Sequence, residues 1–328
     1  MPTARIFVPT YRRPRLLPRA LASLRAQTFP DWVCEVHNDD PADPAPAQLV
    51  ARLADPRITL ANHPRNLGGT ATFNLFFRAT AEPFYSMLED DNWWEPDFLA
   101  TMLATAATHP AVTVFWANMR IWEEQPDGEF RDTGRLVWPA ATAPQLMPWG
   151  QPAQIGGALF SHGAALFRSR PGDDFATPDV PIAVTEPFRE RGLPHPLVLV
   201  PQPVANFSLT RQSARSRDAT EWAELQAMLA ATFLRARPPD AAGLAQLWSD
   251  ARAQRPTGTT NLILAALADP RCRFLLAPAR AADWWVVLRG FVRRPGLYLR
   301  LRRSRRVHAD WWTYLEQHTA ARWQEVAP

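Results

Sequence analysis

Short apolar runs alternate with amphipathic stretches along the first half of the chain. Apolar runs of this length fit buried strands, and apolar residues three or four positions apart fit helices that pack on them. Their alternation is typical of strands joined by crossover helices in a mainly parallel sheet, so we predict an α/β fold. The predicted strands are Arg5–Val8, Trp32–His37, Ile58–Ala61, Phe84–Leu88 and Val112–Trp116, with Ala164–Arg168 and Leu197–Val200 completing the sheet.

Segments with helical periodicity lie between these strands, and the same periodicity continues through the C-terminal third of the chain. It is visible from residue 16 to 24, from Gly69 to Ala79 and after Pro96. The stretch Gln125–Gly157 is rich in Pro, Gly and Trp and is predicted to form loops or a hairpin inserted beside the binding site. From about Arg217 the pattern is helical, which predicts one domain over residues 1–215 and a helical appendage over residues 216–328.

Polar residues follow three of the predicted strands where each strand ends. These ends are Pro9 to Tyr11, Asn38 to Asp40 and Glu89 to Asn92. Ligands of open α/β sheets bind beyond the carboxyl ends of the strands, so we expect the three ends to meet in one crevice.

Glu89, Asp90 and Asp91 are consecutive carboxylates that repel one another unless a cation or solvent offsets their charge. Mg²⁺ or Mn²⁺ suits such oxygens and typically takes one or two protein carboxylates, with phosphate oxygens and water as the other ligands. The alternative is a solvated acidic loop ahead of a helix near Glu95. The cluster alone leaves both interpretations open.

Composition narrows the possible chemistry. All 36 basic residues are arginine, which excludes a P-loop lysine or a Schiff-base lysine. The two cysteines, Cys34 and Cys272, lie far apart, so neither a disulfide framework nor a zinc site is expected and a reducing compartment fits best. The N-terminus shows no apolar signal segment and no stretch is long enough to span a bilayer, so we expect a cytoplasmic protein.

Positive charge is concentrated near the C-terminus. Eight arginines lie in Arg289–Arg306 without an acid between Asp283 and Asp310, and the rest of the chain is net acidic, which argues against nucleic acid as a partner. The segment pairs these arginines with tryptophans and aliphatic residues. This pattern suits either a helix on an anionic membrane, which would place the chain on the inner face of the membrane, or a packed helix with a solvated arginine face.

Four segments establish a resemblance between Ile6 and Leu99. In order they are VPTYRRPRLLPRALASLRAQTFPDW, HNDDPAD, NLGGTATFN and LEDDNWWEPDFL. In order and spacing they resemble the N-terminal half of bacterial family-2 glycosyltransferases with the Rossmann-like GT-A fold. The resemblance implies a metal-dependent, inverting enzyme of the hexosyltransferase type. Its donor would be a nucleotide-diphosphate sugar, and its hydroxyl acceptor a glycan, a lipid-linked sugar or a small molecule.

The resemblance also assigns roles. It places Asp91 as the ligand of Mg²⁺ or Mn²⁺ and Glu89 toward the ribose or a metal-bound water, whereas Asp90 is expected to point away from the metal. Asp39 would read the base or ribose. The residues implied to bind the nucleotide-sugar are Pro9, Thr10, Tyr11, Asp39, Asn66, Gly68, Glu89 and Asp90.

Three positions depart from the family pattern. Asp40 stands where glycine is usual, Glu89 is longer than the usual aspartate, and Phe73 stands where many members have arginine. Arg12, Arg13 or Arg65 could supply the missing positive charge to the diphosphate.

An inverting transfer needs a base for the acceptor hydroxyl. By its place after the family-like GGALFSHGAALFR, Glu186 is the predicted catalytic base, although only one acid of the usual pair is present and Pro187 follows it. The alternative for Glu186 is a plain acid at a helix start. Other acids nearby are Asp173, Asp174 and Asp179, and the polar pair Arg211 and Gln212 occupies the place of a loop that closes over the diphosphate.

Aromatic residues follow the acidic cluster. Trp93, Trp94, Trp138 and Trp149 are candidates for sugar contacts, whereas core positions are favoured for Trp116 and Trp122 and a structural role for His162. A non-catalytic nucleotide-sugar-binding scaffold is the alternative function. A nucleotidyltransferase would need a glycine-rich phosphate loop and a lysine near the first strand, and neither is present.

Overall fold

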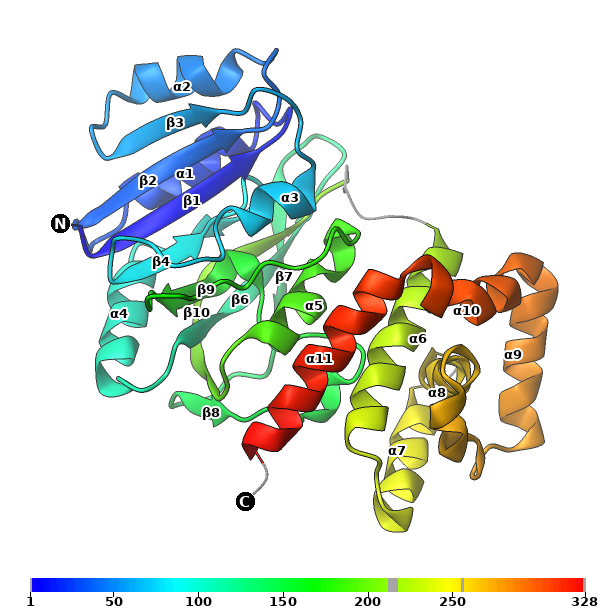
Figure 1. Ribbon diagram of the computed structural model, residues 1–328. Helices are drawn as coiled ribbons and strands as arrows, with labels where there is room; N and C mark the ends of the chain where they lie inside the picture. Colours follow the sequence, from blue (N-terminus) through cyan, green and yellow to red (C-terminus); the bar gives the residue numbers. More distant parts are fainter. Residues whose placement is uncertain (1, 212–217, 255–256, 327–328) are drawn as a thin grey trace. The chain divides into compact units, whose positions relative to one another are not determined.

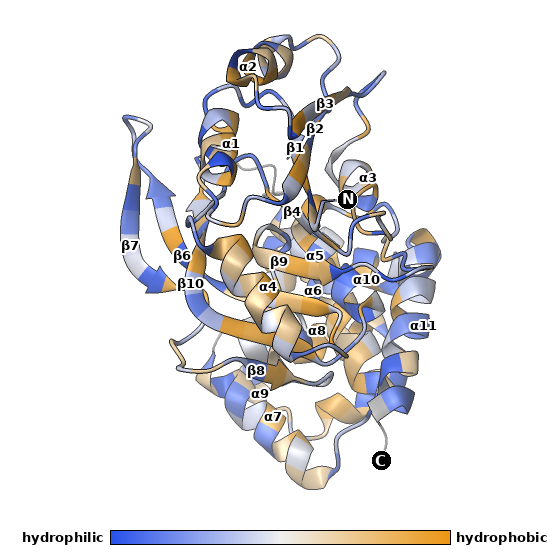
Figure 2. Cartoon of the chain, turned by 90° about the vertical axis from the view of Figure 1, so that its left-hand side faces the viewer, coloured by the Kyte–Doolittle hydropathy of each residue, from blue (hydrophilic) through white to orange (hydrophobic). Residues whose placement is uncertain are grey.

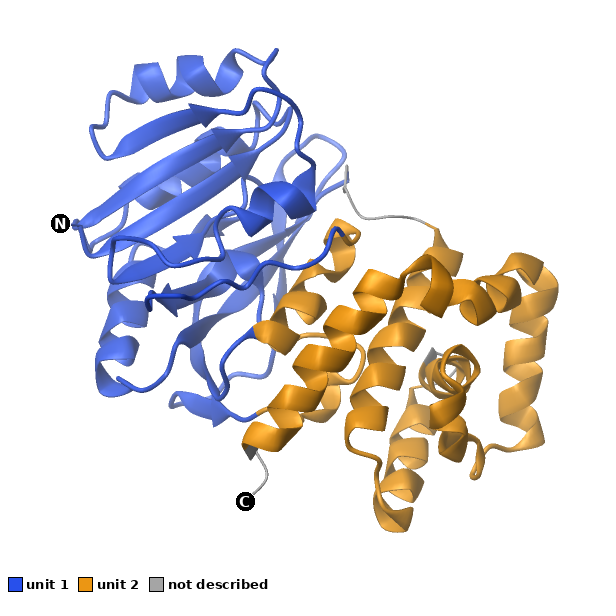
Figure 3. Ribbon diagram, in the orientation of Figure 1, with its two compact units in different colours: residues 1–148, 160–179, 193–213 blue, residues 149–159, 180–192, 214–328 orange. Residues whose placement is uncertain are grey.

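The computed structural model in Figure 1 describes residues 2–211, 218–254 and 257–326. The chain divides into two compact units, shown in Figure 3, each built from separate stretches of sequence. The predicted boundary at residue 215 lies outside the described residues, as do Gln212 and Arg217. Unit 1 comprises residues 1–148, 160–179 and 193–213, and unit 2 comprises residues 149–159, 180–192 and 214–328.

Unit 1 is an α/β structure around one mixed sheet (Figure 1). The described strands run in the order β3-β2-β1-β4-β9-β6-β10-β5, with β7 beside β6 and β8 beside β10. The first four of these are parallel to one another, whereas β9 is antiparallel to both of its neighbours. The strands are β1 Ala4–Thr10, β2 Trp32–Asn38, β3 Ile58–Asn62, β4 Phe84–Met87, β5 Trp93–Trp94, β6 Val114–Glu124, β7 Phe130–Leu136, β8 Gln145–Met147, β9 Ala165–Arg168 and β10 Leu197–Leu209.

The register of the parallel strands brings the predicted polar ends together. Thr10 of β1 pairs with Asn38 of β2, which in turn pairs with Asn62 of β3. On the other side of β1, Phe7 pairs with Met87, so the acidic cluster begins just beyond the same edge. The expected α/β fold is therefore present, and three separate strand ends form one edge of the sheet.

Apolar alternation explains how the helices of unit 1 pack. Leu17, Leu21 and Leu24 of α1 are almost fully buried, as are Ile6 and Val8 of β1. Burial of each leucine contributes about 1.5–3 kcal/mol. Figure 2 shows the apolar strands of this sheet in orange. The helices of unit 1 are α1 Leu17–Arg25, α2 Ala45–Leu53, α3 Gly69–Asn74 and α4 Phe98–Thr108, with the 3₁₀ turn η2 His162–Ala164.

The helix predicted from Gly69 to Ala79 is shorter than expected. It ends at Asn74, whose side chain donates to the Thr177 carbonyl (2.8 Å) and accepts from the Thr177 amide (3.0 Å). The chain then leaves the helix and pairs Arg78 with Asp174 in a short bridge. A partner distant in sequence therefore ends this helix. Helix α2 was not predicted at all.

Unit 2 is helical apart from short turns. Trp248, Trp312, Ile263 and Leu315 lie in its core. Among the helices that the structure describes, none has the length and apolar content needed to cross a bilayer. Its elements are α5 Thr185–Gly192, α6 Ala219–Ala236, α7 Ala241–Ala253, α8 Thr257–Ala268, α9 Ala281–Arg293, α10 Pro295–Val307 and α11 Ala309–Val326, with the 3₁₀ turns η1 Pro152–Gln154, η3 Ile182–Val184 and η4 Pro270–Leu276.

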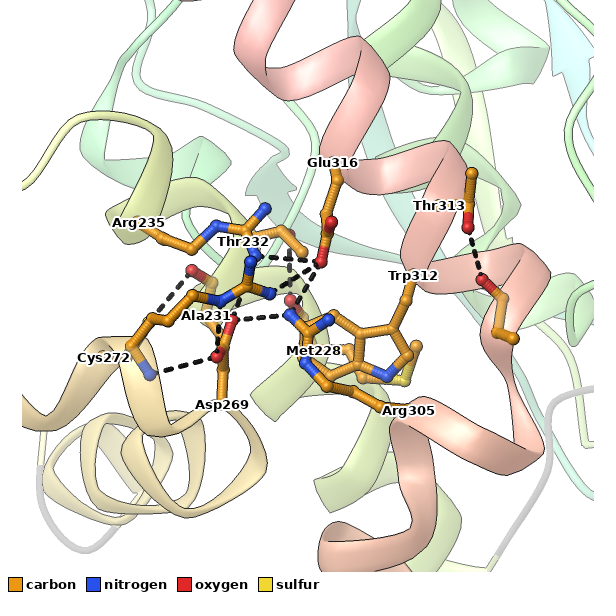
Figure 4. A network of polar contacts seen from close by, with 12 residues as sticks. Met228, Ala231, Thr232, Arg235, Asp269, Cys272, Arg305, Trp312, Thr313 and Glu316 are labelled. Carbon is orange, nitrogen blue, oxygen red and sulfur yellow. Dashed lines mark hydrogen bonds and ion pairs between the residues drawn. The ribbon is translucent and has the colours of Figure 1, made fainter.

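Figure 4 shows an ion-pair network that joins four of these elements. The fully buried Asp269 accepts hydrogen bonds from Arg271 (3.1 Å), Arg235 (3.2 Å) and Arg305 (2.7 Å). Glu316 of α11 accepts from the same three arginines. A buried carboxylate needs such partners, since its charge would otherwise be costly.

Candidate functional site

Asp90 is a buried carboxylate in the segment that follows β4. It accepts a hydrogen bond from Thr10 Oγ1 (2.8 Å) and lies 3.2 Å from Arg13 Nη1. Burial, followed by the charge of Asp91, raises the pKa of Asp90 to about 7. Asp90 thus faces the end of β1 and links two neighbouring strand ends.

The Asp91 side chain is more accessible, with 19% of it exposed, and its Oδ2 contacts Arg13 Nη1. Its backbone carbonyl accepts from Arg19 Nη2 (2.6 Å) and from the Ser208 hydroxyl. Backbone contacts therefore hold Asp91 in place while its carboxylate stays at the edge of the sheet.

Arg19 owes its position to aromatic neighbours. Its guanidinium carbon lies 3.9 Å from the ring centres of Trp93 and of Phe130, and burial lowers its pKa to about 10. Trp93 in turn packs on Trp122, with ring centres 5.1 Å apart. Trp93 thus supports the backbone of the acidic cluster.

Glu89 is turned toward a glycine. Its Oε2 accepts from Asn92 Nδ2 (2.7 Å), and a Cβ atom on Gly163 would lie 2.7 Å from that same oxygen. Asn92 also accepts a hydrogen bond from the Ser208 amide (2.9 Å). The longer side chain of glutamate reaches this place, and the absence of a side chain at Gly163 makes room for it.

Asp39 organises the loop ahead of α3. Its Oδ1 accepts from the Leu67 amide (2.8 Å) and its Oδ2 from the Gly68 amide (3.0 Å), while His63 Nδ1 lies 2.8 Å from Oδ1. A carboxylate has about four acceptor positions, and three are used here. These three contacts therefore leave about one acceptor position of the Asp39 carboxylate unused.

A histidine pair behind Asp39 was not foreseen from the sequence. His63 Nε2 lies 2.9 Å from His37 Nδ1, and His37 Nε2 lies 3.1 Å from Glu35 Oε1. Desolvation by burial lowers the pKa of His37 to about 4. With a proton on Nδ1 of each ring, His37 can donate to His63 and His63 can donate to Asp39. The signal for the pair was that His37 and His63 both lie at the ends of neighbouring strands.

The remaining predicted nucleotide residues lie around these groups. Gly68 has a φ of 83° at the start of α3, a conformation that favours glycine, and Asn66 is exposed beside it. Tyr11 follows Pro9 at the end of β1 and is 42% exposed. An exposed ring beyond a strand end can stack on a base.

Arg12 and Arg13 serve different carboxylates. Arg12 Nε lies 2.5 Å from Asp40 Oδ2, and this hydrogen bond is the main reason that the pKa of Asp40 lies below its usual range. Arg13 contacts Asp90 and Asp91 instead. Arg65 is exposed. Of the three candidate arginines, Arg13 is therefore the one in contact with the acidic cluster.

The fit of a divalent metal depends on Asp91. Among the described residues, no three His, Cys, Asp or Glu side chains are grouped so that they could hold a metal ion by themselves. Asp90 is directed to Thr10 and Glu89 to Asn92, which leaves Asp91 as the accessible carboxylate. Such a site fits Mg²⁺ or Mn²⁺ only where phosphate oxygens and water supply most of the ligands.

Comparison with known families identifies this part of the chain. Residues 5–158 match the family described as glycosyl transferase family 2. The matched segment contains the edge formed by Thr10, Asp39 and the acidic cluster. Residues 5–158 belong to glycosyl transferase family 2, and we call them the family-2 domain.

Two curated relatives of the family-2 domain are named as glycosyltransferases. WcaA of Escherichia coli (strain K12), named for colanic acid biosynthesis, is 30% identical over 104 residues, which is 31% of this chain. EpsH of Bacillus subtilis (strain 168) is 29% identical over 138 residues, which is 42% of this chain. The matched region covers 37% of the length of each relative.

Solved structures share the fold of this chain, including its family-2 domain. Residues 1–349 of S. aureus TarS superpose with a TM-score of 0.56 at 12% identity, covering 99% of this chain and 92% of that one. The UDP complex of the same protein gives a TM-score of 0.55 at 13% identity with the same coverage. The GT-A fold predicted from the sequence is therefore confirmed.

Glu186 lies outside the matched segment and in the other compact unit from Asp91. It is half-buried in the first turn of α5. The residues that follow it, Arg189 to Arg191, are fully buried. Its predicted role as base remains a prediction.

Other residues that the sequence singled out have structural places. His162 is buried among Phe73, Phe77 and Phe160, as a structural histidine would be. Phe73, where many members have arginine, contributes a ring to this cluster. Trp116 is buried, whereas Trp122 is half-buried beside Trp93.

Proposed function

We propose that this chain is an inverting glycosyltransferase that moves a sugar from a nucleotide-diphosphate sugar to a hydroxyl acceptor. One observation carries the proposal: within a family-2 domain, the accessible carboxylate of Asp91 lies beside Arg13 at the carboxyl edge of β1 and β4. Support for the donor class comes from TarS, which has the same fold and whose solved structures include complexes with UDP and UDP-GlcNAc.

The nucleoside would bind along the strand ends of β1 and β2. In this proposal Asp39 offers its remaining acceptor position to the base or ribose, and the Tyr11 ring contacts the base. Pro9, Thr10, Asn66, Gly68, Glu89 and Asp90 complete the proposed donor site, with Asp90 acting through its bond to Thr10.

We assign Asp91 as the protein ligand of Mg²⁺ or Mn²⁺. The metal would offset the charge that develops on the leaving diphosphate. Arg13 already lies against Asp91, and its guanidinium can turn toward a phosphate when a cation takes over that carboxylate. Arg13 would then add a second positive charge to the site.

Glu186 is the proposed catalytic base. The carboxylate takes the proton of the acceptor hydroxyl. At the same time the oxygen of that hydroxyl attacks the anomeric carbon from the face opposite the diphosphate, which leaves with the bond electrons. The acceptor would be a glycan, a lipid-linked sugar or a small molecule. The relative named for colanic acid biosynthesis favours polysaccharide synthesis. A lipid-linked acceptor would require a cytoplasmic chain to reach the inner face of a membrane, and Arg289–Arg306 is the segment suited to that contact.

The competing function is a nucleotide-sugar-binding scaffold that keeps the fold without turnover. Two residues favour it. Phe73 stands in place of arginine, and the Glu89 carboxylate already accepts a hydrogen bond from Asn92.

A donor assay separates the two functions. The chain is incubated with UDP-, GDP- and dTDP-sugars, with Mg²⁺, Mn²⁺ or a chelator, and release of the nucleoside diphosphate is measured beside donor binding by calorimetry. We expect metal-dependent release from one donor class. Donor binding without release from any donor would support the scaffold, and absence of both would overturn the proposed donor site.

A further inference from the structure

Helix α9 exposes a row of large apolar side chains. Trp285 is 62% exposed, Leu288 51% and Val292 83%, whereas Val287 on the opposite side is buried. The three exposed positions are three or four residues apart, so they lie on one face of the helix. In water, each of these side chains forgoes the stabilisation that burial would give.

Arginines accompany this row, and they fall into two groups according to whether a carboxylate lies beside them. Arg300 and Arg305 are neutralised within unit 2: Arg300 binds Glu224 (2.9 Å) and Asp218 (3.3 Å), and Arg305 belongs to the network of Figure 4. The other six arginines of the segment have no acidic partner among the described residues. They are Arg289, Arg293, Arg294, Arg302, Arg303 and Arg306, and all are exposed.

Within α9 and α10, Asp283 is the one acid that accompanies the six arginines. The sequence has no acid between Asp283 and Asp310. Asp283 itself is fully buried and lies 3.2 Å from Arg252. Two independent features, an exposed apolar row and a group of arginines without an acidic partner among the described residues, thus occur on consecutive helices.

We propose that α9 and α10 form a membrane-docking face, in which Trp285, Leu288 and Val292 enter the interface of a bilayer and the six arginines bind anionic lipid headgroups. A soluble polyanion would satisfy the arginines but leave the apolar row in water. An anionic lipid surface accommodates both groups. Since α9 has 13 residues, it lies in the interface and does not cross the membrane.

This proposal goes beyond glycosyl transfer and does not depend on it. The attraction between the six arginines and anionic headgroups is electrostatic, so binding should weaken as the ionic strength rises. Failure of the donor assay would leave this surface unaffected, and failure of membrane binding would leave the donor site unaffected.

Vesicle sedimentation with the full chain tests the docking face. Phosphatidylcholine vesicles that contain phosphatidylglycerol are compared with vesicles of phosphatidylcholine alone. We expect binding only to the anionic vesicles. The triple change Arg293→Gln, Arg302→Gln and Arg306→Gln should weaken it about 100-fold, at roughly fivefold per arginine.

The apolar row is tested separately by Trp285→Ser, Leu288→Ser and Val292→Ser together, and by Val292→Asp alone. We expect either variant to weaken binding at least about tenfold. Matched controls in unit 1 are Leu146→Ser, at a leucine that is 54% exposed, and Arg52→Gln with Arg135→Gln. Circular dichroism and the unfolding midpoint verify the fold of each variant, and all of these changes are on the surface.

Three outcomes would overturn the proposal. One is no binding to anionic vesicles, and another is equal binding to both kinds of vesicle. The third is loss of binding in the arginine variant with full binding in both apolar variants, because this would indicate a polyanion-binding face without insertion. Loss of binding in both classes, with the controls unchanged, would support it.

Discussion

His63 Nδ1 lies 2.8 Å from Asp39 Oδ1, and the same carboxylate accepts hydrogen bonds from the backbone amides of Leu67 and Gly68. The imidazole comes from the chain just after β3 and the carboxylate from the end of β2. This pair therefore fixes the loop that leads into α3 against the strand ends. The family resemblance implies that Asp39 contacts the nucleoside, and in the structure the same carboxylate anchors the loop that leads into α3.

Removing His63 should loosen this anchor. We expect His63→Ala to weaken nucleoside diphosphate binding and to lower the free energy of unfolding by about 1–3 kcal/mol, because Asp39 loses a buried donor. His63→Gln, which can still donate, should recover part of both. Calorimetry with UDP and urea unfolding measure the two quantities, with His109→Ala as the control. Unchanged affinity in His63→Ala would separate His63 from the donor site.

Gly163 offers a steric test of the place given to Glu89. A methyl group at this position would lie 2.7 Å from Glu89 Oε2 and 3.0 Å from Asn92 Nδ2. We expect Gly163→Ala to displace the Glu89 carboxylate and to weaken donor binding, with only a small loss in the free energy of unfolding, because the close atom is the end of a flexible side chain. The matched control is Gly290→Ala in α9, where a Cβ atom meets no atom within 4 Å. That change should be neutral or stabilising by up to about 1 kcal/mol. Equal effects of the two substitutions would contradict the packing described for Glu89.

Acid should weaken the network of Figure 4. Desolvation raises the pKa of Asp269, but hydrogen bonds from Arg271 and Arg305 outweigh it, so the pKa lies below its usual range. Stability from this carboxylate is therefore present above the pKa of an unfolded aspartate, near about 4, and is lost as pH falls through the folded value. At neutral pH, Asp269→Asn should lower the free energy of unfolding by about 3–5 kcal/mol, as expected when a buried pair is broken.

The check is urea unfolding of the wild type and Asp269→Asn between pH 7 and pH 3. The difference between them should shrink toward acid pH. Asp250→Asn, at an exposed position of α7, is the control and should change little. A difference that stays constant with pH would show that Asp269 contributes through packing and not through its charge.

The sequence was most informative where local pattern and parallel strand geometry agree. Apolar runs located β1, β2, β3 and β4 nearly to the residue, and parallel pairing then required Thr10, Asn38 and the acidic cluster to share an edge. Side-chain partners distant in sequence were not predictable in this way. The early end of α3 depends on Asn74 meeting Thr177. The pairing of His37 with His63 depends on β2 and β3 being neighbours.

A buried arginine is the second feature of the fold that the hydrophobic pattern of the sequence did not predict. Arg191 is fully buried and donates to the carbonyl groups of Gln154, Ile155, Gly157 and Pro187, so it holds residues 154–157 against α5 within unit 2. Sequence periodicity treats an arginine as a surface residue. The grouping of residues 149–159 and 180–192 with the C-terminal helices could therefore not be read from it.

The division of roles between Asp91 and Glu186 gives the sharpest test of the proposed reaction. Asp91→Asn should weaken metal-dependent donor binding, because an amide is a poorer ligand for a hard cation than a carboxylate. Glu186→Gln should leave donor binding intact and abolish transfer, since the amide cannot take a proton from the acceptor. Calorimetry with the nucleoside diphosphate and Mn²⁺, together with a transfer assay, measures both, and Glu129→Gln at an exposed position of the β6–β7 turn is the control. If both variants lose donor binding equally, Glu186 belongs to the donor site and another carboxylate must act as the base. Full transfer by Glu186→Gln would remove it from the chemistry altogether.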